Sequence, residues 1–459
     1  MTTAETPATE AVGAKVMRHL GDLLRLAWPV MLSRAGILIM AFADIAMLGR
    51  YGEGAVGVSN LAIAIFVPVI VVTIGMASGM VPVVSQAYGA GNREECGRAF
   101  RRGLCWGVFC SIIGIAVVWR GETLLGWFGQ TPELAKAGGD VAVALAPGVL
   151  AQMIFAVCAF YLESTRRPMF ALTVMIIANV VNVILNWVMI FGNLGFPEMG
   201  AVGAAVASTI ARFGAAGLML WYVFSQDRAP ALGVRGPWET VWGPGGWRLG
   251  WQMRKLGGSA AISNGFETVG FAAMSLMAGT LGIAALDAYS ISHNLVSTIF
   301  MVGLGLAVAT GVRVGQATGA GDPREAAFAG WTGLLAAFLI MGGLGVVVLL
   351  FNREIALIYT NDPELAARAA SVFLFSAFVF MPDSLQVVMG QAIRALGDAW
   401  VPVAAYVASF VTLMIPLGWY LTREEGWDER GLILAVIVAC VLATVLLVWR
   451  FRVLTRVRA

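Results

Sequence analysis

The chain has 459 residues, of which 59% are apolar and 12% are charged, and its formal net charge is +3. Soluble globular domains carry about 25% charged residues, so this composition excludes both a water-soluble protein and a disordered one. The small net charge and the lack of a long basic stretch also exclude a nucleic-acid-binding role. The composition is typical of a protein that crosses a membrane many times.

The cysteines and histidines predict that no cofactor is bound. The five cysteines are odd in number and include no Cys-x-x-Cys pair, so neither a disulfide framework nor a zinc site is expected. Two histidines argue against haem or a histidine-rich metal centre. The first 24 residues are mostly polar and lack an apolar core, which predicts that there is no cleavable signal peptide.

Apolar windows of about 20 residues, the length that crosses a bilayer as a helix, predict twelve spans in two sets of six. The first set lies near 25–49, 55–80, 101–120, 140–163, 168–191 and 199–224. The second set lies near 256–281, 287–312, 327–351, 369–394, 400–421 and 430–452. We expect an all-α membrane protein with two pseudo-symmetric six-helix lobes, an N-lobe at 25–224 and a C-lobe at 256–452.

The positions of Lys and Arg predict the orientation. Most of them lie on one side, which holds the N-terminal segment 1–24, the linker 225–255 and the tail 453–459. Cytoplasmic segments carry this excess of positive charge. Both termini are therefore expected in the cytoplasm, in a multi-pass protein of the cell (inner) membrane.

The linker between the lobes is rich in Gly, Pro and Trp. Because Trp side chains favour the depth of the lipid headgroups, the linker is expected to lie along the cytoplasmic face of the membrane, and a gate is the alternative. The residues behind this expectation are Trp238, Trp242, Trp247 and Trp251.

The two halves repeat each other. The segment VVSQAYGAGNRE at 83–94 aligns with RVGQATGAGDPRE at 313–325, which pairs Gln86 with Gln316, and QTPELA at 130–135 aligns with NDPELA at 361–366. Halves with an even number of spans share one orientation, so an axis along the membrane normal relates them. Parallel repeats around a central cavity are a recurring transporter design that works by alternating access, although a channel is not excluded by the repeat alone.

A carboxylate within a span is costly and usually faces a cavity or a partner. Asp44 lies toward the outer end of span 1, at a depth similar to that of Asn186 in span 5. Asn179, Asn182 and Asn186 share one face of span 5 because they are three and four residues apart. Their oxygens suit a hard cation, or an amide can hold the protonated acid. The alternative is that these Asn side chains only bond neighbouring helices.

Two further acids, Glu267 in span 7 and Asp383 in span 10, are expected near the midplane of the C-lobe. Two carboxylates in a poorly solvated site do not both ionise easily, so one is expected to hold a proton, whereas a bound Na⁺ would keep both ionised. Asn264 and Gln386 lie one turn away and can complete the site. Pro382 is expected to kink span 10.

Other polar residues of the spans are expected to be structural. Serine and threonine in a helix often bond back to their own backbone, although a ligand role is the alternative for Ser208. Arg34 and Arg212 are expected to reach the interface or to pair with acids, and Glu163 to form a surface ion pair with Arg166 or Arg167. Thr209 belongs to the same group and has the same alternative. His293 is expected to bridge two helices, and a proton carrier is its alternative.

Several motifs together resemble the multidrug and toxic compound extrusion (MATE) family over about residues 22–450. They are Pro29 followed by ADIAMLGR, QAYGAG, NVILNW, and FGNLGFPEMGAVGAAVAS. In the second half, SNGFETVGF and PDSLQVVMGQAIRALGD resemble the NorM-like branch of that family.

The resemblance implies a V-shaped antiporter that exports organic, mostly cationic or aromatic compounds and is driven by inward Na⁺ or H⁺. It places the family's acids of spans 7 and 10 on Glu267 and Asp383, and the acid of span 1 on Asp44. The asparagine pair of span 5 falls on Asn182 and Asn186. The DinF-like branch has an Asp where this chain has Asn186, which favours coupling through the C-lobe.

Three other classes of protein compete with this interpretation. A lipid-linked oligosaccharide flippase of the same superfamily would be expected to line its cavity with cations, and here the acids outnumber Arg34 and Arg212. A major-facilitator transporter would carry a different motif after span 2. An enzyme is not expected, because no nucleophile or metal motif occurs at a plausible site. The expected partners are small organic cations and membrane lipid, and a monomer is the default expectation.

Overall fold

The computed structural model describes residues 12–52, 54–226, 231–238, 241, 250–423 and 426–458. These residues form a bundle of helices, and no strand occurs within these ranges. The N-terminal half contains α1 (Val12–Tyr51), α2 (Ala55–Ser78), α3 (Met80–Gly89), α4 (Arg93–Trp119), α5 (Gly121–Trp127), α6 (Pro132–Leu145), α7 (Gly148–Ser164), α8 (Met169–Phe191) and α9 (Gly200–Ser225). The C-terminal half contains α12 (Trp251–Thr280), α13 (Ile283–Gly319), α14 (Pro323–Leu350), α15 (Asn352–Tyr359), α16 (Pro363–Ser376), α17 (Phe380–Ala395), α18 (Trp400–Tyr406), α19 (Met414–Arg423) and α20 (Asp428–Arg458).

Each of the twelve predicted crossings corresponds to a helix or a bent pair of helices in the described part of the chain, and eleven of them have the length and hydropathy of a membrane span. Nine helices are long and apolar enough to span a membrane, and two bent pairs, α6 with α7 and α16 with α17, add two more spans. The twelfth crossing, α12, has 30 residues and is less apolar because it carries Ser, Gly and Glu267. At 1.5 Å per residue its length is about 45 Å, which is enough to cross a bilayer.

The two bent spans occupy equivalent positions in the two halves, as a repeat requires. The bend is 40° between α6 and α7 and 45° between α16 and α17. Pro382 lies in the first turn of α17, where its missing N–H costs little, and the bend falls just before it. A kink in the tenth span was expected from this proline.

The first helix begins earlier than the sequence predicted. Span 1 was expected to start near residue 25, but α1 begins at Val12. The extra turns carry Leu23 and His19, which are both buried. Polar residues alternate with these buried ones, so the segment is amphipathic and is not apolar enough for a hydropathy window.

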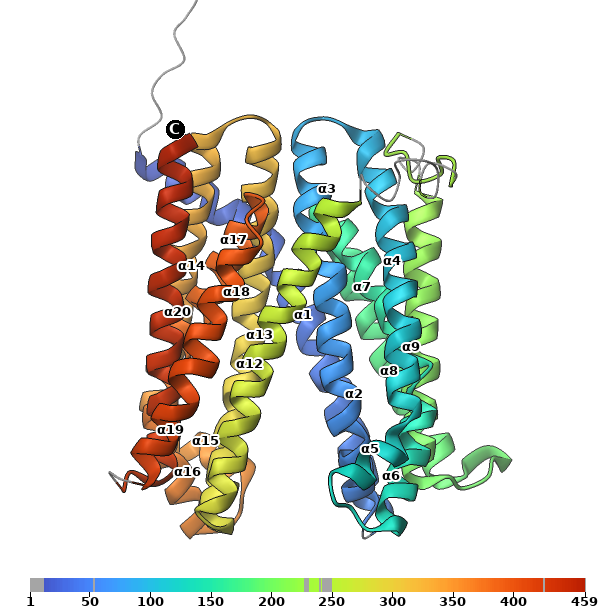
Figure 1. The fold of residues 1–459 in the computed structure, drawn as a ribbon. Helices are drawn as coiled ribbons and strands as arrows, with labels where there is room; N and C mark the ends of the chain where they lie inside the picture. Colours follow the sequence, from blue (N-terminus) through green and yellow to red (C-terminus); the bar gives the residue numbers. More distant parts are fainter. Residues whose placement is uncertain are drawn as a thin grey trace, which may run out of the picture.

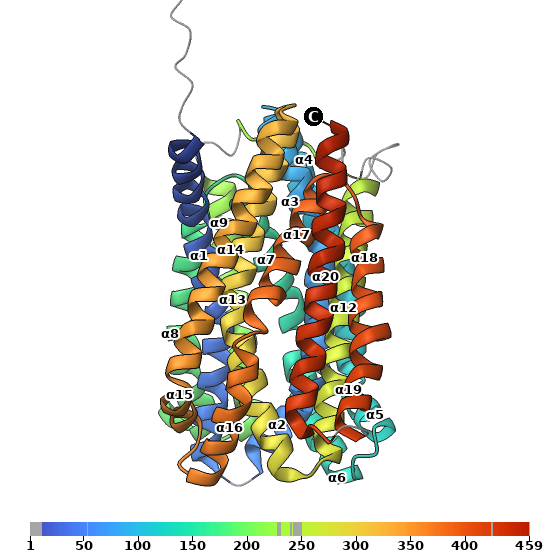
Figure 2. The same ribbon diagram turned by 90° about the vertical axis from the view of Figure 1, so that its left-hand side faces the viewer.

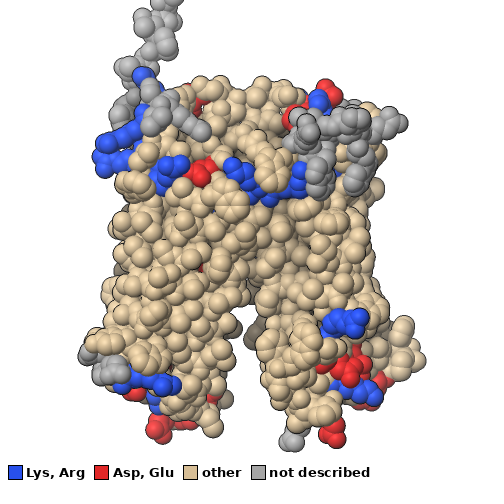
Figure 3. Space-filling model, viewed as in Figure 1, with Lys and Arg blue, Asp and Glu red and all other residues tan. Residues whose placement is uncertain are grey.

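The helices form two lobes, and at one end the first span of each lobe packs against the other lobe (Figure 1). The beginning of α1 lies beside α13 and α14 of the C-lobe, and the beginning of α12 lies beside α2 and α3 of the N-lobe. The start of α1 and the end of α20 lie at this same end of the molecule, which we call the terminal end (Figure 2). Charged residues gather at the two ends, and a cleft separates the lobes at the end opposite the termini (Figure 3).

The repeated motif closes the terminal end of the interface between the lobes. Gln86 Nε2 donates to the backbone oxygen of Ala395 over 2.7 Å, and Gln316 Nε2 donates to that of Ser164 over 2.9 Å. A Cβ at Gly89 would overlap the backbone oxygen of Gln316. The equivalent Cβ at Gly319 would overlap that of Gln86. The two glycines therefore let the backbones of the lobes touch.

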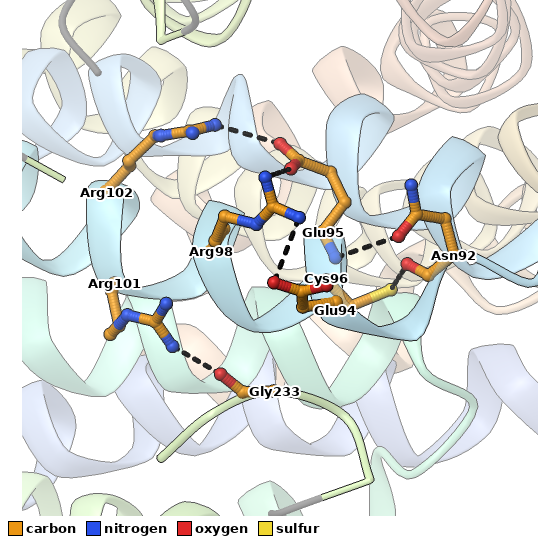
Figure 4. A network of polar contacts seen from close by, with 8 residues as sticks. All are labelled: Asn92, Glu94, Glu95, Cys96, Arg98, Arg101, Arg102 and Gly233. Carbon is orange, nitrogen blue, oxygen red and sulfur yellow. Dashed lines mark hydrogen bonds and ion pairs between the residues drawn. The ribbon is translucent and has the colours of Figure 1, made fainter. Parts of the chain in front are cut away.

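Only part of the linker is described. Arg101 of α4 donates to the backbone oxygen of Gly233, beside a set of ion pairs at the start of that helix (Figure 4). Leu232 and Val234 are buried, so residues 231–238 pack on the N-lobe. Trp238 and Trp251 are exposed. Trp242 and Trp247, on which the expected interfacial segment also rests, lie outside the described residues.

Candidate functional site

The N-lobe contains a polar cluster around Asp44. Asp44 Oδ1 accepts hydrogen bonds from Asn182 Nδ2 at 3.0 Å and from Asn186 Nδ2 at 2.6 Å, and its Oδ2 accepts one from the Ser208 hydroxyl at 2.5 Å. The four residues come from α1, α8 and α9, which pack against one another. Asn182 and Asn186 are one turn apart and completely buried. The structure thus brings together the acid of span 1 and the asparagine pair of span 5.

Three donors on one carboxylate fix its orientation. Asn186 Nδ2 also donates to Asn182 Oδ1 at 3.2 Å. Asn186 Oδ1 is buried without a hydrogen-bond partner among the described residues. This oxygen and those of Asp44 are of the kind that bind a hard cation.

Two expectations for this lobe need correction. Ser208 was expected to bond back to its own helix, but its hydroxyl donates to Asp44 on another helix. Thr209 likewise donates across to the backbone oxygen of Ala144 at 2.9 Å. Neither hydroxyl bonds back because α9 packs closely on polar atoms of its neighbours.

Asn179 does not contact Asp44 through a hydrogen bond. Its Nδ2 donates to the backbone oxygens of Gly36 at 3.1 Å and of Met175 at 2.8 Å. Asn179 therefore joins α8 to α1, which is the bridging role considered as the alternative for the span 5 amides.

The C-lobe contains a second cluster, in which one amide joins two carboxylates. Gln386 Nε2 donates to Glu267 Oε1 at 3.0 Å and to Asp383 Oδ1 at 3.2 Å. Cys440 Sγ of α20 lies 3.8 Å from Asp383 Oδ1. Asp383 and Gln386 are buried, and Glu267 is partly exposed. Gln386 Oε1 has no partner among the described residues, so this cluster also holds a free oxygen.

Asn264 lies one turn from Glu267 but forms part of a different feature. It lines a cavity of about 100 Å³ between the lobes, together with Arg34, Gln391 and Arg394. No group of three or more His, Cys, Asp or Glu side chains suited to a metal ion occurs in the described ranges. Any Na⁺ at Glu267 and Asp383 would therefore also need amide, backbone or water oxygens.

Glu163 does not form the surface ion pair expected of it. The side chain is buried, and its Oε1 accepts from Arg34 Nη2 at 3.2 Å. Its place at the end of a span suggested exposure, but α1 covers it. Arg212 stacks on the Phe66 ring at 5.0 Å, and its Nη1 has no partner in the described part of the chain.

His293 lies among aromatic rings. Its ring centroid is 5.3 Å from that of Phe271 on α12 and 6.1 Å from that of Tyr289 on its own helix. This placement agrees with packing between two helices.

The sequence interpretation overlooked Arg394 and Cys440. Arg394 is one of the positive charges that the orientation argument assigns to the cytoplasmic side of the membrane, but it is buried in the cavity between the lobes. It lies eleven residues after Asp383, which is close to three helical turns, so the helical period places both on one face of α17. That spacing is the sequence signal from which a position of Arg394 beside Asp383 could have been predicted.

The fold defines a class of polytopic membrane protein with two parallel six-helix lobes and a buried acidic cluster in each lobe. The sequence signature of the MatE family matches residues 29–188 and 259–420. A probable multidrug resistance protein NorM of Caulobacter vibrioides is 35% identical to this chain, over 96% of this chain and 92% of the relative.

A second protein of that name, from Bradyrhizobium diazoefficiens, is 30% identical over 95% of each chain. The crystal structure of the eukaryotic MATE transporter AtDTX14 is similar in fold, with a TM-score of 0.87 at 18% identity over 96% of this chain and 98% of that one. The chain belongs to the MatE family.

Proposed function

We propose that this chain is a multidrug antiporter that exports organic, mostly cationic or aromatic compounds by alternating access, driven by H⁺ or Na⁺. The observation that carries the proposal is the pair of carboxylate clusters inside the lobes, at Asp44 in one lobe and at Glu267 and Asp383 in the other. A cleft separates these lobes at one end (Figure 3). The relatives named multidrug resistance protein NorM support the substrate class.

In this mechanism the inward ion binds Glu267 and Asp383, with Asp44 as a second site. Ion binding neutralises the carboxylates and favours the lobe arrangement that releases the organic cation. Linkage requires the ion and the compound to weaken each other's binding by the same factor. Direct competition for the carboxylates and preference for different lobe arrangements both meet that requirement.

The distribution of positive charge supports a cytoplasmic position for the terminal end. The cleft of this structure then faces the outside of the inner membrane, and the interface closed by Gln86 and Gln316 faces the cytoplasm. We expect the protein to act as a monomer, since each lobe supplies its own acidic cluster.

The test is ethidium efflux from proteoliposomes under a Na⁺ gradient and, separately, under a pH gradient. We expect Asp383→Asn and Glu267→Gln to abolish coupled export without loss of expression, because each removes a charge that holds the driving ion. Arg353→Gln, an exposed position on α15, should change nothing. Unchanged export in both acid variants would contradict coupling through the C-lobe.

The second candidate function is a lipid-linked oligosaccharide flippase of the same superfamily. Arg34, Arg212 and Arg394 are cations inside the lobes, which is the feature this alternative needs, but Glu163 neutralises Arg34. Absence of dye movement under both gradients would favour the flippase, and a lipid-linked substrate would be tested next.

A further inference from the structure

Arg394, in the last turn of α17, is a buried cation without a direct counter-ion. It is 4% exposed, and its Nε and Nη2 atoms have no hydrogen-bond partner among the described residues. Arginine stays charged in proteins and has five N–H donors. A charge removed from water requires a partner of opposite sign to be stable. The side chain is therefore suited to an anion that the chain does not supply.

The neighbouring charged groups already have partners. Arg34, the other arginine of the cavity, pairs with Glu163 at 3.2 Å. Glu267 is near enough for its charge to interact with that of Arg394, but its Oε1 accepts the amide of Gln386. Arg394 is thus the one cavity arginine whose Nε and Nη2 both remain available within the described part of the chain.

The cavity beside Arg394 has the size and lining of a small anion site. Its volume is about 100 Å³, and the amides of Asn264 and Gln391 line it together with the guanidinium. Phe160 of the N-lobe also lines the cavity, and the Arg34 guanidinium lies over its ring at 5.1 Å.

One residue of the cavity wall also lies one helical turn from the acidic pair of the C-lobe. Asn264, which lines the cavity, precedes Glu267 by three residues on α12, a rise of about 4.5 Å. One compound can therefore place an anionic group at Arg394 and a cationic group at Glu267 and Asp383. A guanidinium binds a carboxylate through two parallel hydrogen bonds, which makes the carboxylate the matching group.

We propose that Arg394 and the cavity between the lobes bind the carboxylate of transported zwitterionic compounds. This inference rests on the proposed export function and deepens it by naming the residue that recognises a carboxylate on the substrate. In it, Arg394 contacts the substrate and selects for the carboxylate, whereas Glu267 and Asp383 serve both the cation and the driving ion.

The test compares a rhodamine methyl ester, a permanent cation, with the same rhodamine as its free acid, a zwitterion at neutral pH. Binding to the purified full-length protein is measured by fluorescence polarisation. We expect the wild type to bind the acid more tightly than the ester. Arg394→Gln should weaken binding of the acid by about tenfold and leave binding of the ester nearly unchanged, since one charge-assisted pair is lost. Arg353→Gln is the matched control and should alter neither.

Equal or tighter binding of the ester by the wild type would overturn the proposal. An equal loss for both dyes in Arg394→Gln would overturn it as well and would assign the arginine to the acidic cluster. If that variant does not fold, the comparison of the two dyes in the wild type still tests the preference for the carboxylate. The proposed export function fails separately, when the wild type moves neither dye under an ion gradient.

Discussion

Asp44 depends on three hydrogen-bond donors from two other helices, and the Ser208 hydroxyl is the one that can be removed with the least change of shape. Ser208→Ala should lower the free energy of unfolding by about 1–3 kcal/mol, because a partly buried carboxylate loses a donor. The control is Ser111→Ala, which is equally buried but whose hydroxyl donates to Gly107 of its own helix. Thermal unfolding of both purified variants measures the difference. Equal melting temperatures would show that the donor to Asp44 contributes nothing to stability.

At the residue scale, the acids could be predicted from sequence and their surroundings only in part. Asp44 and Asn186 were matched by depth, which follows from helical rise, and the structure joins them by a hydrogen bond. Glu163 and Arg394 were misplaced because each lies at the end of its helix. Whether a helix end is covered depends on helices distant in sequence, in these cases α1 and the opposite lobe.

At the element scale, the amphipathic start of α1 joins one lobe to the other. His19 Nε2 lies 3.1 Å from Glu325 Oε1 of α14, and Arg313 of α13 donates to the backbone oxygen of His19 at 2.5 Å. His19 also packs edge-on against Phe328, with the ring centroids 4.7 Å apart. His19→Ala should therefore lower stability by about 1–3 kcal/mol, through loss of a buried polar contact and of ring packing.

Met17→Ala is the control for this change, because Met17 lies on the same helix and is exposed. The measurement is the melting temperature of the solubilised protein. A drop in the control as large as that in His19→Ala would mean that the effect arises from the helix itself and not from the contact between the lobes.

Most of the helices could be predicted from the length of their apolar segments, but α1 and α12 show the limit of that criterion. The first turns of α1 were missed because only one face of them is apolar. The start of α12 lies against α2 at Gly75 and Gly257, where small residues replace apolar bulk. Helices that pack against protein on several sides need not be apolar all round, so hydropathy alone underestimates them.

At the scale of the whole molecule, the repeat is expressed as a symmetric closure of the terminal end. Gln86 and Gln316 each donate across the interface to the last turn of the bent span of the other lobe. The sequence revealed the repeat but not this contact, because the pairing partners Ser164 and Ala395 lie outside the repeated motifs. Two such bonds that exist only while the terminal end is closed bias the lobes toward the arrangement seen here.

Removing both donors should therefore shift the lobes toward closure of the cleft. The double variant loses three hydrogen bonds between the lobes, because Gln316 Oε1 also accepts one from Arg166 Nε at 2.7 Å. Each lost bond costs about 1 kcal/mol, and about 1.4 kcal/mol changes an equilibrium tenfold, so Gln86→Leu with Gln316→Leu should raise the alternative arrangement by about two orders of magnitude. Spin labels at Trp127 on α5 and Ile358 on α15, both highly exposed on opposite lobes, report the change by double electron–electron resonance after the five native cysteines are replaced. We expect a shorter distance to gain population in the double variant.

Gln252→Leu, an exposed glutamine at the terminal end, should leave the distribution of distances unchanged. An unchanged distribution in the double variant would mean that the glutamines only fill the interface and that packing at Gly89 and Gly319 holds the terminal end closed.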